Sequence, residues 1–527
     1  MIRRRALAEW FAVAGVALAL SAGLTFLAAP AFLADQHSYN LLVVKKLEPD
    51  LFARDLLYRH DPSRLHVPLF LGVHTALARR LGGDPERALA WLAWPIGAVF
   101  LAGHYAFFRA LGASAPAAAL AALGALTIRN SLGGEYWGFE GVRSASTRTI
   151  VAGLTPLLLL AFVRWRTRPW LPAYYLLLGV VANLHPPSAY LLAETTALAH
   201  LWLERGSRRS LGQVGAGIVL FALGALPFLA PFLAGGDHVG DPALLGLARR
   251  AMASRFSYLF YPLDPAALLS VAFHLAFPLT VWLWWQRRAD PALAPLSAVA
   301  GGAAVTAFAG LAIVQGVGAV LDRPYVDVQQ LRALRLVYPV LLGGLALAYT
   351  RLLERRTWRA RGAVAALLLL SLVPPGALIH AGDDERRHAV KVALGIAAPR
   401  SSSPLPGTAI AERDALYDWV ARTTPRTALF LSDDFNFRVR TRRSITGTGR
   451  DGALVFLAGT RPFVAWHRLN GELEACRDVR GRGCWFELGR RLGADYAVVD
   501  PMLTGAGAPA DFEKVWARGG FSVWRRL

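Results

Sequence analysis

Long apolar runs are the feature of this sequence that most limits its fold. About a dozen runs of roughly 15–25 residues follow one another up to residue 382, each near the roughly 20 residues that a helix needs to cross a membrane. Stretches such as LLLLAFV and ALLLLSLV are apolar on every face, whereas the strands of a β-barrel alternate apolar and polar residues. The runs therefore predict a polytopic α-helical membrane bundle and exclude a soluble enzyme with a single anchor.

Composition and charge agree with a membrane protein. Of the 527 residues, 55% are hydrophobic and 18% charged, against roughly 45–50% and about 25% in soluble domains. The formal net charge of +21 comes mostly from arginines, which form short clusters between the apolar runs, as the positive-inside bias requires. No basic helix with interleaved aromatic residues occurs, so we expect no nucleic-acid partner.

The arginine clusters predict the topology. The clusters at 164–168, 205–209, 286–288 and 354–361 mark cytoplasmic loops. An apolar stretch at about 11–33 follows a charged start and predicts a first span with the N-terminus inside. Eight further spans are expected at about 148–163, 170–184, 188–203, 212–234, 266–285, 292–316, 336–353 and 362–380. Segments 34–64, 131–147, 235–265, 317–335 and 381–527 then lie outside.

Residues 65–130 must contain an even number of crossings. Three apolar segments, 65–81, 88–108 and 112–129, compete there, so one of them is short, re-entrant or fused with a neighbour. Two crossings give about 11 spans in total.

The composition changes beyond Gly382. Charges become frequent, and short runs typical of strands alternate with amphipathic helical runs. We expect a transmembrane domain at 1–382, a Pro/Ser-rich linker at 383–407 and a small extracytoplasmic α/β domain at 408–527. Within that domain the pattern predicts helices at 415–423 and 484–493 and strands at 427–433, 494–500 and 520–527.

The first outer loop carries the strongest candidate for a reacting group. Asp35 follows the first span directly, with His37 and Tyr39 beside it, and ionisable groups at the outer ends of spans are often kept for function. The alternative is that the acids of this loop, including Asp50 and Asp55, are solvated charges. Residues 38–58 have apolar residues at helical spacing and predict a helix lying in the membrane interface.

Other outer segments offer groups suited to sugars and phosphates. Aromatic rings and glycines surround four charged residues of the second outer segment, which can hydrogen-bond hydroxyl groups, namely Glu135, Glu140, Arg143 and Arg148. An aromatic belt at the interface is the alternative. His185 stands at a span boundary before two prolines, where a structural role at the helix break is favoured over catalysis.

Arg332 and Arg335 are three residues apart at the entry to a span, so they share one helical face. Arginines on the outer side run against the positive-inside bias, and a phosphate group held bidentately explains them. Ion pairing with Asp322 or Asp327, or contact with lipid phosphate, is the alternative.

Cys476 and Cys484 are the only cysteines, and a polar Arg/Gly loop joins them. Because the topology places their domain outside, where disulfides persist, a disulfide between them is predicted. Two separate thiols in a cytoplasmic domain are the alternative. The sequence has none of the signatures GxxxxGK[ST], HExxH, GxSxG or CxxC, which argues against an ATP-driven pump, a zinc protease or a serine hydrolase of those types.

This arrangement resembles the GT-C class of integral-membrane glycosyltransferases, which use polyprenyl-phosphate-linked sugars. The resemblance rests on the inside N-terminus, an acid just past the first span (Asp35 in LADQHSY), an outer loop with an interfacial helix, about 11 spans and an extracytoplasmic C-terminal domain. The patterns DWVARTTPRTALFLSDD, RRSITG and RRLGADYAVVD are also similar to the C-terminal domain of a bacterial branch of this class.

The resemblance implies an inverting hexosyl or pentosyl transfer in a bacterial inner membrane, with the C-terminal domain in the periplasm. Asp35 is then the general base, and Arg332 and Arg335 stabilise the leaving lipid phosphate. The implied partners are membrane lipids, a polyprenyl-phosphate sugar and a glycan, lipid or protein acceptor. The resemblance implies no cofactor and predicts no metal, while a divalent ion stays open.

Two alternatives come from other classes of protein. One is a transporter of lipid-linked glycans, a class that typically has repeated halves and charged or broken helices at mid-membrane, and neither feature is evident in the sequence. A non-catalytic subunit or scaffold of GT-C type is favoured by the lack of an acidic neighbour beside Asp35, since Gln36 follows it.

Overall fold

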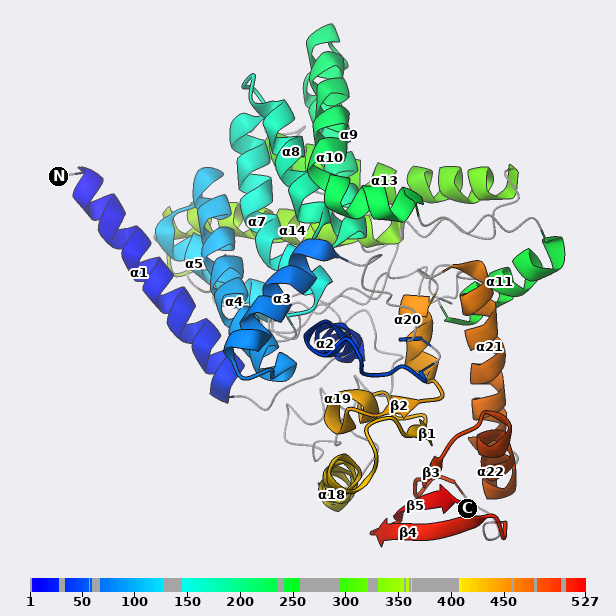
Figure 1. Cartoon of the computed structure of the whole chain (residues 1–527). Coiled ribbons are helices and arrows are strands. Elements are labelled where there is room, and N and C mark those ends of the chain that lie inside the picture. Colours follow the sequence, from blue (N-terminus) through cyan, green and yellow to red (C-terminus); the bar gives the residue numbers. More distant parts are fainter. Residues whose placement is uncertain are drawn as a thin grey trace.

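The chain divides into a large helical region and a small C-terminal domain, which lies below the helices in Figure 1. The computed structural model describes residues 2–27, 34–55, 57–58, 67–127, 145–234, 241–255, 293–320, 330–354, 357–359, 362, 407–455, 459–477, 481–503 and 509–527. Apart from residues 362 and 407, the expected spans at 266–285 and 362–380 and the linker at 383–407 lie outside the described residues.

The helices of the first region follow the apolar runs of the sequence. Their bounds are α1 (Ile2–Ala22), the π-helix η1 (Gly23–Leu27), α2 (Ala34–Leu47), α3 (Pro68–Arg80), α4 (Pro85–Ala110), α5 (Ala115–Gly124), the 3₁₀ turn η3 (Ala125–Thr127), α7 (Thr147–Trp165), α8 (Leu171–Ala182), α9 (Pro186–Leu203), α10 (Arg208–Ala234), α11 (Pro242–Arg255), α13 (Leu293–Val320), the 3₁₀ helix η6 (Gln330–Leu336) and α14 (Val337–Glu354).

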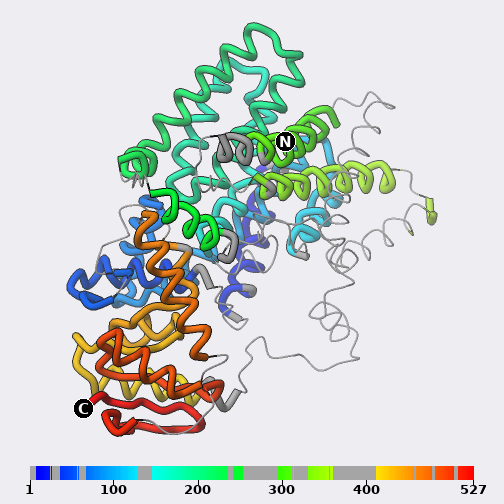
Figure 2. The backbone as a smooth tube through the Cα atoms, turned by 90° about the vertical axis from the view of Figure 1, so that its right-hand side faces the viewer, coloured from blue at the N-terminus to red at the C-terminus, as the bar shows by residue number. Residues whose placement is uncertain are grey.

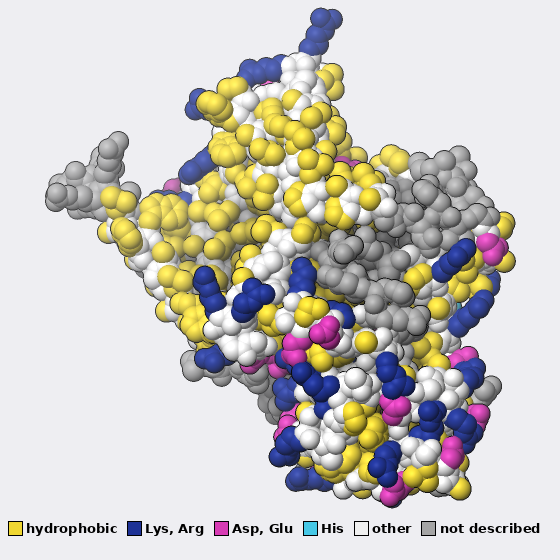
Figure 3. Space-filling model, viewed as in Figure 1, with side chains coloured by type: hydrophobic (Ala, Val, Ile, Leu, Met, Phe, Trp, Pro, Cys, Tyr) yellow, Lys and Arg dark blue, Asp and Glu magenta, His cyan; other side chains and the backbone are white. Residues whose placement is uncertain are grey.

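The protein is a helical membrane protein. Five segments of the described residues are long and apolar enough to cross a bilayer, namely Pro85–Ala110, Thr147–Trp165, Arg208–Ala234, Leu293–Gly310 and Arg332–Glu354. On α10 the exposed side chains include Ile218, Val219, Leu223 and Leu233, and hydrophobic side chains cover most of the upper part of the face drawn in Figure 3. The total of about 11 spans stays a prediction.

The three apolar segments of residues 65–130 differ in length. α4 has 26 residues, whereas α3 has 13 and α5 has 10. At about 1.5 Å per residue, α3 and α5 each reach well under the roughly 30 Å of the hydrocarbon core. α3 is amphipathic, ends at Arg79 and Arg80, and packs against α2 and α4. Length alone therefore does not choose between α3 and α5 as the short segment that the charge parity requires, and the pair of crossings stays a prediction.

Small residues set the closest helix packing, between α8 and α10. A Cβ atom on Gly179 would lie 2.2 Å from the backbone oxygen of Phe221, and one on Gly224 would lie 2.5 Å from that of Leu176. Only glycine permits this backbone approach, which is the usual way in which membrane helices gain packing contacts.

The C-terminal domain is an α/β fold, as predicted. Its five-stranded sheet has the order β2-β1-β3-β5-β4, in which β1 pairs in parallel with β2 and β3, and β5 pairs antiparallel with β3 and β4. The strands are β1 (Leu429–Leu431), β2 (Ser444–Ile445), β3 (Tyr496–Val499), β4 (Phe512–Arg518) and β5 (Phe521–Arg526). The helical elements are α18 (Gly407–Thr423), α19 (Phe437–Thr441), η7 (Gly449–Asp451), α20 (Gly452–Val455), α21 (Thr460–Ala475) and α22 (Gly481–Arg491).

Alternating side chains of the central strands build two cores on opposite faces of the sheet. On β3, Ala497 and Val499 belong to the core shared with α21 and α22, and Val498 belongs to the core shared with α18 and α19. The predicted elements at 415–423, 427–433, 484–493, 494–500 and 520–527 each contain or overlap an observed helix or strand of the same kind. The sequence reading missed α21 and β4.

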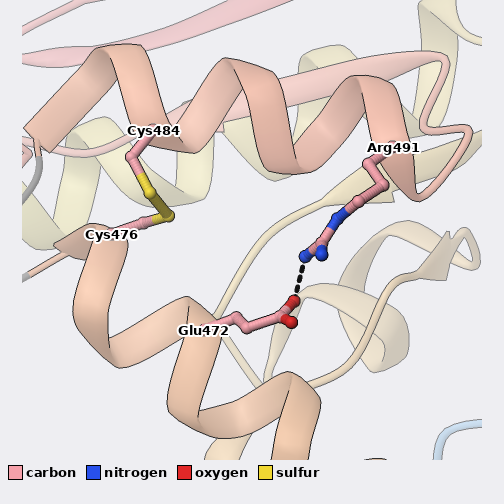
Figure 4. Close-up of a disulfide and its surroundings, with 4 residues drawn as sticks. All are labelled: Glu472, Cys476, Cys484 and Arg491. Atoms are coloured by element: carbon pink, nitrogen blue, oxygen red, sulfur yellow. Dashed lines mark hydrogen bonds and ion pairs between the residues drawn. A yellow bond between two sulfur atoms is a disulfide. The ribbon is translucent and has the colours of Figure 1, made fainter.

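The predicted disulfide is present. Cys476 at the end of α21 is bonded to Cys484 in α22, and an ion pair between Glu472 and Arg491 joins the same two helices (Figure 4). The bond therefore fixes the two helices that cover one face of the sheet.

Candidate active site

Helix α2 carries the predicted base and lies in the interior of the protein. It spans Ala34–Leu47, so it begins before and ends before the expected interfacial helix at 38–58. Asp35 is in its first turn, where the helix dipole favours a negative charge, although the Asp35 side chain lies outside the described part of the structure. Residues 41–44 are all at most 3% exposed.

The expectation of a helix with one face in the lipid interface was wrong for α2. Its neighbours α3, α4 and α19 cover it, and α19 belongs to the C-terminal domain. Figure 1 shows α2 between the membrane helices and that domain. The apolar spacing did predict a helix, but its apolar side chains pack against protein rather than lipid.

Tyr39 joins the first outer loop to the second. Its hydroxyl group lies 2.7 Å from the hydroxyl of Thr147, the first residue of α7, and its ring lies edge-on to Phe70. Arg148 is the next residue of α7 and is half-buried. The structure thus brings the segments of Tyr39 and Arg148 together, whereas Glu135, Glu140 and Arg143 lie outside the described residues.

His37 faces the C-terminal domain. Its ring lies edge-on to Phe435, with ring centroids 4.7 Å apart, and only 8% of the residue is exposed. Burial lowers the pKa of His37 to about 4, and the nearby guanidinium groups of Arg413, Arg450 and Arg440 act in the same direction. The imidazole is therefore neutral at pH 7, which suits hydrogen bonding rather than charge pairing.

His185 has the structural role that its position favoured. It is the N-cap of α9, and its Nδ1 accepts from the backbone N–H of Ser188 at 3.3 Å and lies 2.5 Å from the Ser188 hydroxyl. This satisfies a backbone donor that the helix start leaves open. A role of His185 in substrate binding stays a prediction.

Arg332 and Arg335 lie on η6, the 3₁₀ helix that leads into α14. Because a 3₁₀ helix has three residues per turn, the two side chains leave the helix on the same side, as the sequence predicted. They are 6% and 1% exposed. η6 packs on α9 through Ala333 and Leu334, which contact Leu191, so the arginine pair lies near the first turns of α9.

Glu194 is an ionisable residue that the sequence reading missed. It lies within α9, with Tyr190 one turn earlier and Gln330 of η6 beside it. A carboxyl group inside an apolar helix is costly in lipid and is usually kept for function. The signal was visible in the run LLAETTALAHLWL, where Glu194 is the one charged residue.

The structure also places Asp55 and Asp50 in opposite environments. Asp50 is exposed, in agreement with a solvated loop charge. Asp55 is fully buried, where it receives the guanidinium group of Arg438 from the C-terminal domain. Burial raises the pKa of Asp55, and Arg438 opposes that shift. The solvated alternative is therefore wrong for Asp55.

Within the described part of the chain, no group of three or more His, Cys, Asp or Glu side chains is arranged to hold a metal ion. The described candidates are Asp35, His37 and Tyr39 on α2 and the buried pair Arg332 and Arg335 on η6. A carboxylate can take a proton from a hydroxyl group, and paired guanidinium groups can bind a phosphate.

Comparisons with known proteins give a distant likeness in structure. The sequence matches no protein-family model, and no curated protein matches it. A solved structure of an oligosaccharyltransferase from Archaeoglobus fulgidus, a complex with zinc and sulfate, is 13% identical, with 93% of this chain and 68% of that chain covered and a TM-score of 0.45. The archaeal oligosaccharyltransferase AglB from the same organism, in complex with an inhibitory peptide and a dolichol-phosphate, is 14% identical, with 93% and 69% covered and a TM-score of 0.46.

Proposed function

We propose that this chain is a membrane glycosyltransferase of GT-C type, which moves a sugar from a polyprenyl-phosphate donor to an extracytoplasmic acceptor with inversion at the anomeric carbon. The observation that carries the proposal is the position of Asp35 in the first turn of α2, a buried helix joined to the start of α7 by Tyr39 and Thr147. The sequence resemblance to that class agrees with this position.

In the proposed step the acceptor hydroxyl loses its proton to the Asp35 carboxylate. Its oxygen forms a bond to the anomeric carbon while the bond from that carbon to the phosphate oxygen breaks. The products are the glycosylated acceptor, polyprenyl phosphate and a protonated Asp35. General-base catalysis of this kind contributes roughly 10²–10⁴-fold to a rate.

The other residues bind and orient in this proposal. Arg332 and Arg335, on one side of η6, hold the phosphate and stabilise the charge that develops on it. In the proposal, His37 and Tyr39 of α2 and Arg148 of α7 orient the acceptor or the sugar, together with Glu135, Glu140 and Arg143 of the second outer segment. The protein then works in a bacterial inner membrane, with the C-terminal domain outside.

The test is to purify the full chain with its bound lipid and identify that lipid by mass spectrometry. We expect a polyprenyl phosphate or its sugar adduct. Vesicles that hold the purified protein and a polyprenyl-phosphate sugar are then expected to glycosylate an acceptor from the cell envelope, and Asp35→Asn to abolish transfer. A protein that carries no polyprenyl lipid and transfers no sugar supports the subunit alternative.

A further inference from the structure

Arg438 connects the C-terminal domain to the first outer loop inside a buried cluster. Its Nε donates to Asp55 Oδ2 at 2.6 Å and its Nη2 to Asp55 Oδ1 at 3.1 Å. Its Nη1 and Nη2 also donate to the two carboxylate oxygens of Asp451, at 2.7 and 2.8 Å. The guanidinium group thus holds one carboxylate from each part of the chain, and the three side chains are 1%, 0% and 8% exposed.

The backbone completes the cluster. Asp55 also accepts from the N–H groups of Leu57, Tyr58 and Ile445, and Asp451 accepts from that of Thr448 at 2.9 Å. The ring of Tyr58 lies 5.3 Å from the Arg438 Cζ. The bond from Ile445 to Asp55 crosses from the C-terminal domain to the loop after α2, so it forms only when the two parts are docked in this orientation. The other bonds hold each carboxylate in place within its own part.

Three further ion pairs that described residues form across this boundary are of a different kind. Arg54 with Asp495, Arg426 with Glu48, and Arg440 with Glu86 all have exposed or half-exposed side chains. Exposed pairs of this kind contribute about 0–1 kcal/mol each. Arg438 differs from these arginines because, among the described residues at this boundary, it is fully buried and lies between two acids.

Helix α2 lies in the region that this cluster joins. Apolar residues of α2 share one core with Val439 of α19 and with Leu454, Phe463 and Trp466 farther along the C-terminal domain. Near its start, His37 contacts Phe435, and Asp55 follows eight residues after its end. The position of α2 therefore depends on how the C-terminal domain is seated.

We propose that Arg438 is a positioning residue for the transfer reaction: by seating the C-terminal domain on the loop after α2, it fixes α2, the helix that carries Asp35, relative to the membrane helices. This inference rests on the proposed function, in which Asp35 is the base. An apolar group in place of a buried ion pair often stabilises a protein as well or better, so stability alone does not account for the cluster. The planar guanidinium group of Arg438 binds two fixed carboxylates and so defines the orientation of the C-terminal domain, whereas apolar contacts do not define an orientation.

The experiment uses the full chain in detergent micelles and amide hydrogen exchange followed by mass spectrometry. Arg438→Lys keeps the charge and loses the fork, and Arg54→Gln is the matched control because it breaks the exposed ion pair one residue before Asp55. In Arg438→Lys we expect the α2 amides to exchange about tenfold faster than in the wild type, with α21 and α22 within about twofold. Arg54→Gln is expected to leave α2 within about twofold of the wild type.

Two exchange results would overturn the inference. One is α2 protection in Arg438→Lys equal to that of the wild type. The other is equal acceleration in α2, α21 and α22, which means that the C-terminal domain unfolds as a whole. If Arg438→Lys does not fold, Asp55→Asn replaces it, because it keeps the side-chain shape and removes one charged partner of Arg438, with the same expectations.

The kinetic readout separates positioning from a merely structural role. In the transfer assay Arg438→Lys is expected to lower kcat about tenfold to a hundredfold, because small displacements of a reacting group have effects of that size. The donor KM is expected to stay within about twofold, since the arginine pair on η6 is untouched. A raised KM with unchanged kcat contradicts the inference. If the wild type transfers no sugar, the proposed function fails, while the exchange result still decides whether Arg438 fixes α2.

Discussion

The ring of His37 lies edge-on against the ring of Phe435, with 4.7 Å between their centroids. His37 is two residues beyond Asp35 on α2, and Phe435 belongs to the loop between β1 and α19. Two parts of the chain almost 400 residues apart therefore meet within one helical turn of the proposed base. Any account of the site has to include the C-terminal domain.

Asp35→Asn is expected to lower sugar transfer by roughly 10²–10⁴-fold, because the amide cannot accept the acceptor's proton. Asp50→Asn is the matched control, since Asp50 is an exposed acid of the same loop. Transfer by reconstituted protein is measured for both. Activity of Asp35→Asn within about threefold of the wild type would remove Asp35 from the mechanism.

Arg335→Lys is expected to weaken donor binding about tenfold or more despite the unchanged charge. Lysine cannot place two donors on one phosphate, and a hydrogen bond to a charged group is worth about 1.5–3 kcal/mol. Arg208→Lys, at the exposed start of α10, is the control. Binding is followed by native mass spectrometry with a polyprenyl phosphate, and equal affinity in the two variants argues against a phosphate site on η6.

Local pattern sufficed for most of the helices. The spans expected at 148–163, 188–203 and 336–353 correspond to α7, α9 and α14 within about two residues at each end. Proline or Ser/Thr near the starts and basic residues near the ends mark these boundaries in the sequence. The shared face of Arg332 and Arg335 also followed from spacing alone.

Contacts between distant segments could not be predicted in the same way. Asp55 and Arg438 are 383 positions apart, and nothing in the loop around Asp55 distinguishes it from Asp50, which is solvated. The apolar spacing of α2 fits a lipid surface and a protein surface equally well, so only the docked C-terminal domain decides between them. The sequence was sufficient to predict which polar side chains lie at the ends of helices. It was not sufficient to predict which distant residues these side chains contact.

Asp433 is expected to make the C-terminal domain sensitive to pH. Burial raises the pKa of Asp433 to about 6, against the opposing effect of Arg477, whose Nη1 lies 2.6 Å from the Asp433 carboxylate. Between about pH 4 and pH 6 the folded state binds this proton more tightly than the unfolded chain does. The stability contributed by the group is therefore present at pH 4 and lost as the pH rises through about 6.

Asp433→Asn removes that titration. As the pH rises from 4 to 7, the thermal midpoint of the wild type is expected to fall relative to that of Asp433→Asn. Asp418→Asn, at an exposed position of α18, is the control and is expected to show a constant difference. A constant difference for Asp433→Asn as well means that Asp433 titrates alike in the folded and unfolded states.

The disulfide provides the test of topology. Cys476 and Cys484 are bonded, and a bond that closes so short a loop stabilises by roughly 2–3 kcal/mol in the chain-entropy model. Such bonds persist in oxidising compartments, so the two cysteines report on which side of the membrane the C-terminal domain lies.

In intact cells that make the full chain, a membrane-impermeant thiol reagent is expected to label both cysteines only after reduction. Cys476→Ser with Cys484→Ser is the control for background labelling, because no other cysteine exists in the chain. Labelling that needs permeabilised membranes and no reductant would place the C-terminal domain in the cytoplasm. Since α2 and the C-terminal domain share one core, that result would move Asp35 to the cytoplasmic side too and contradict an extracytoplasmic acceptor.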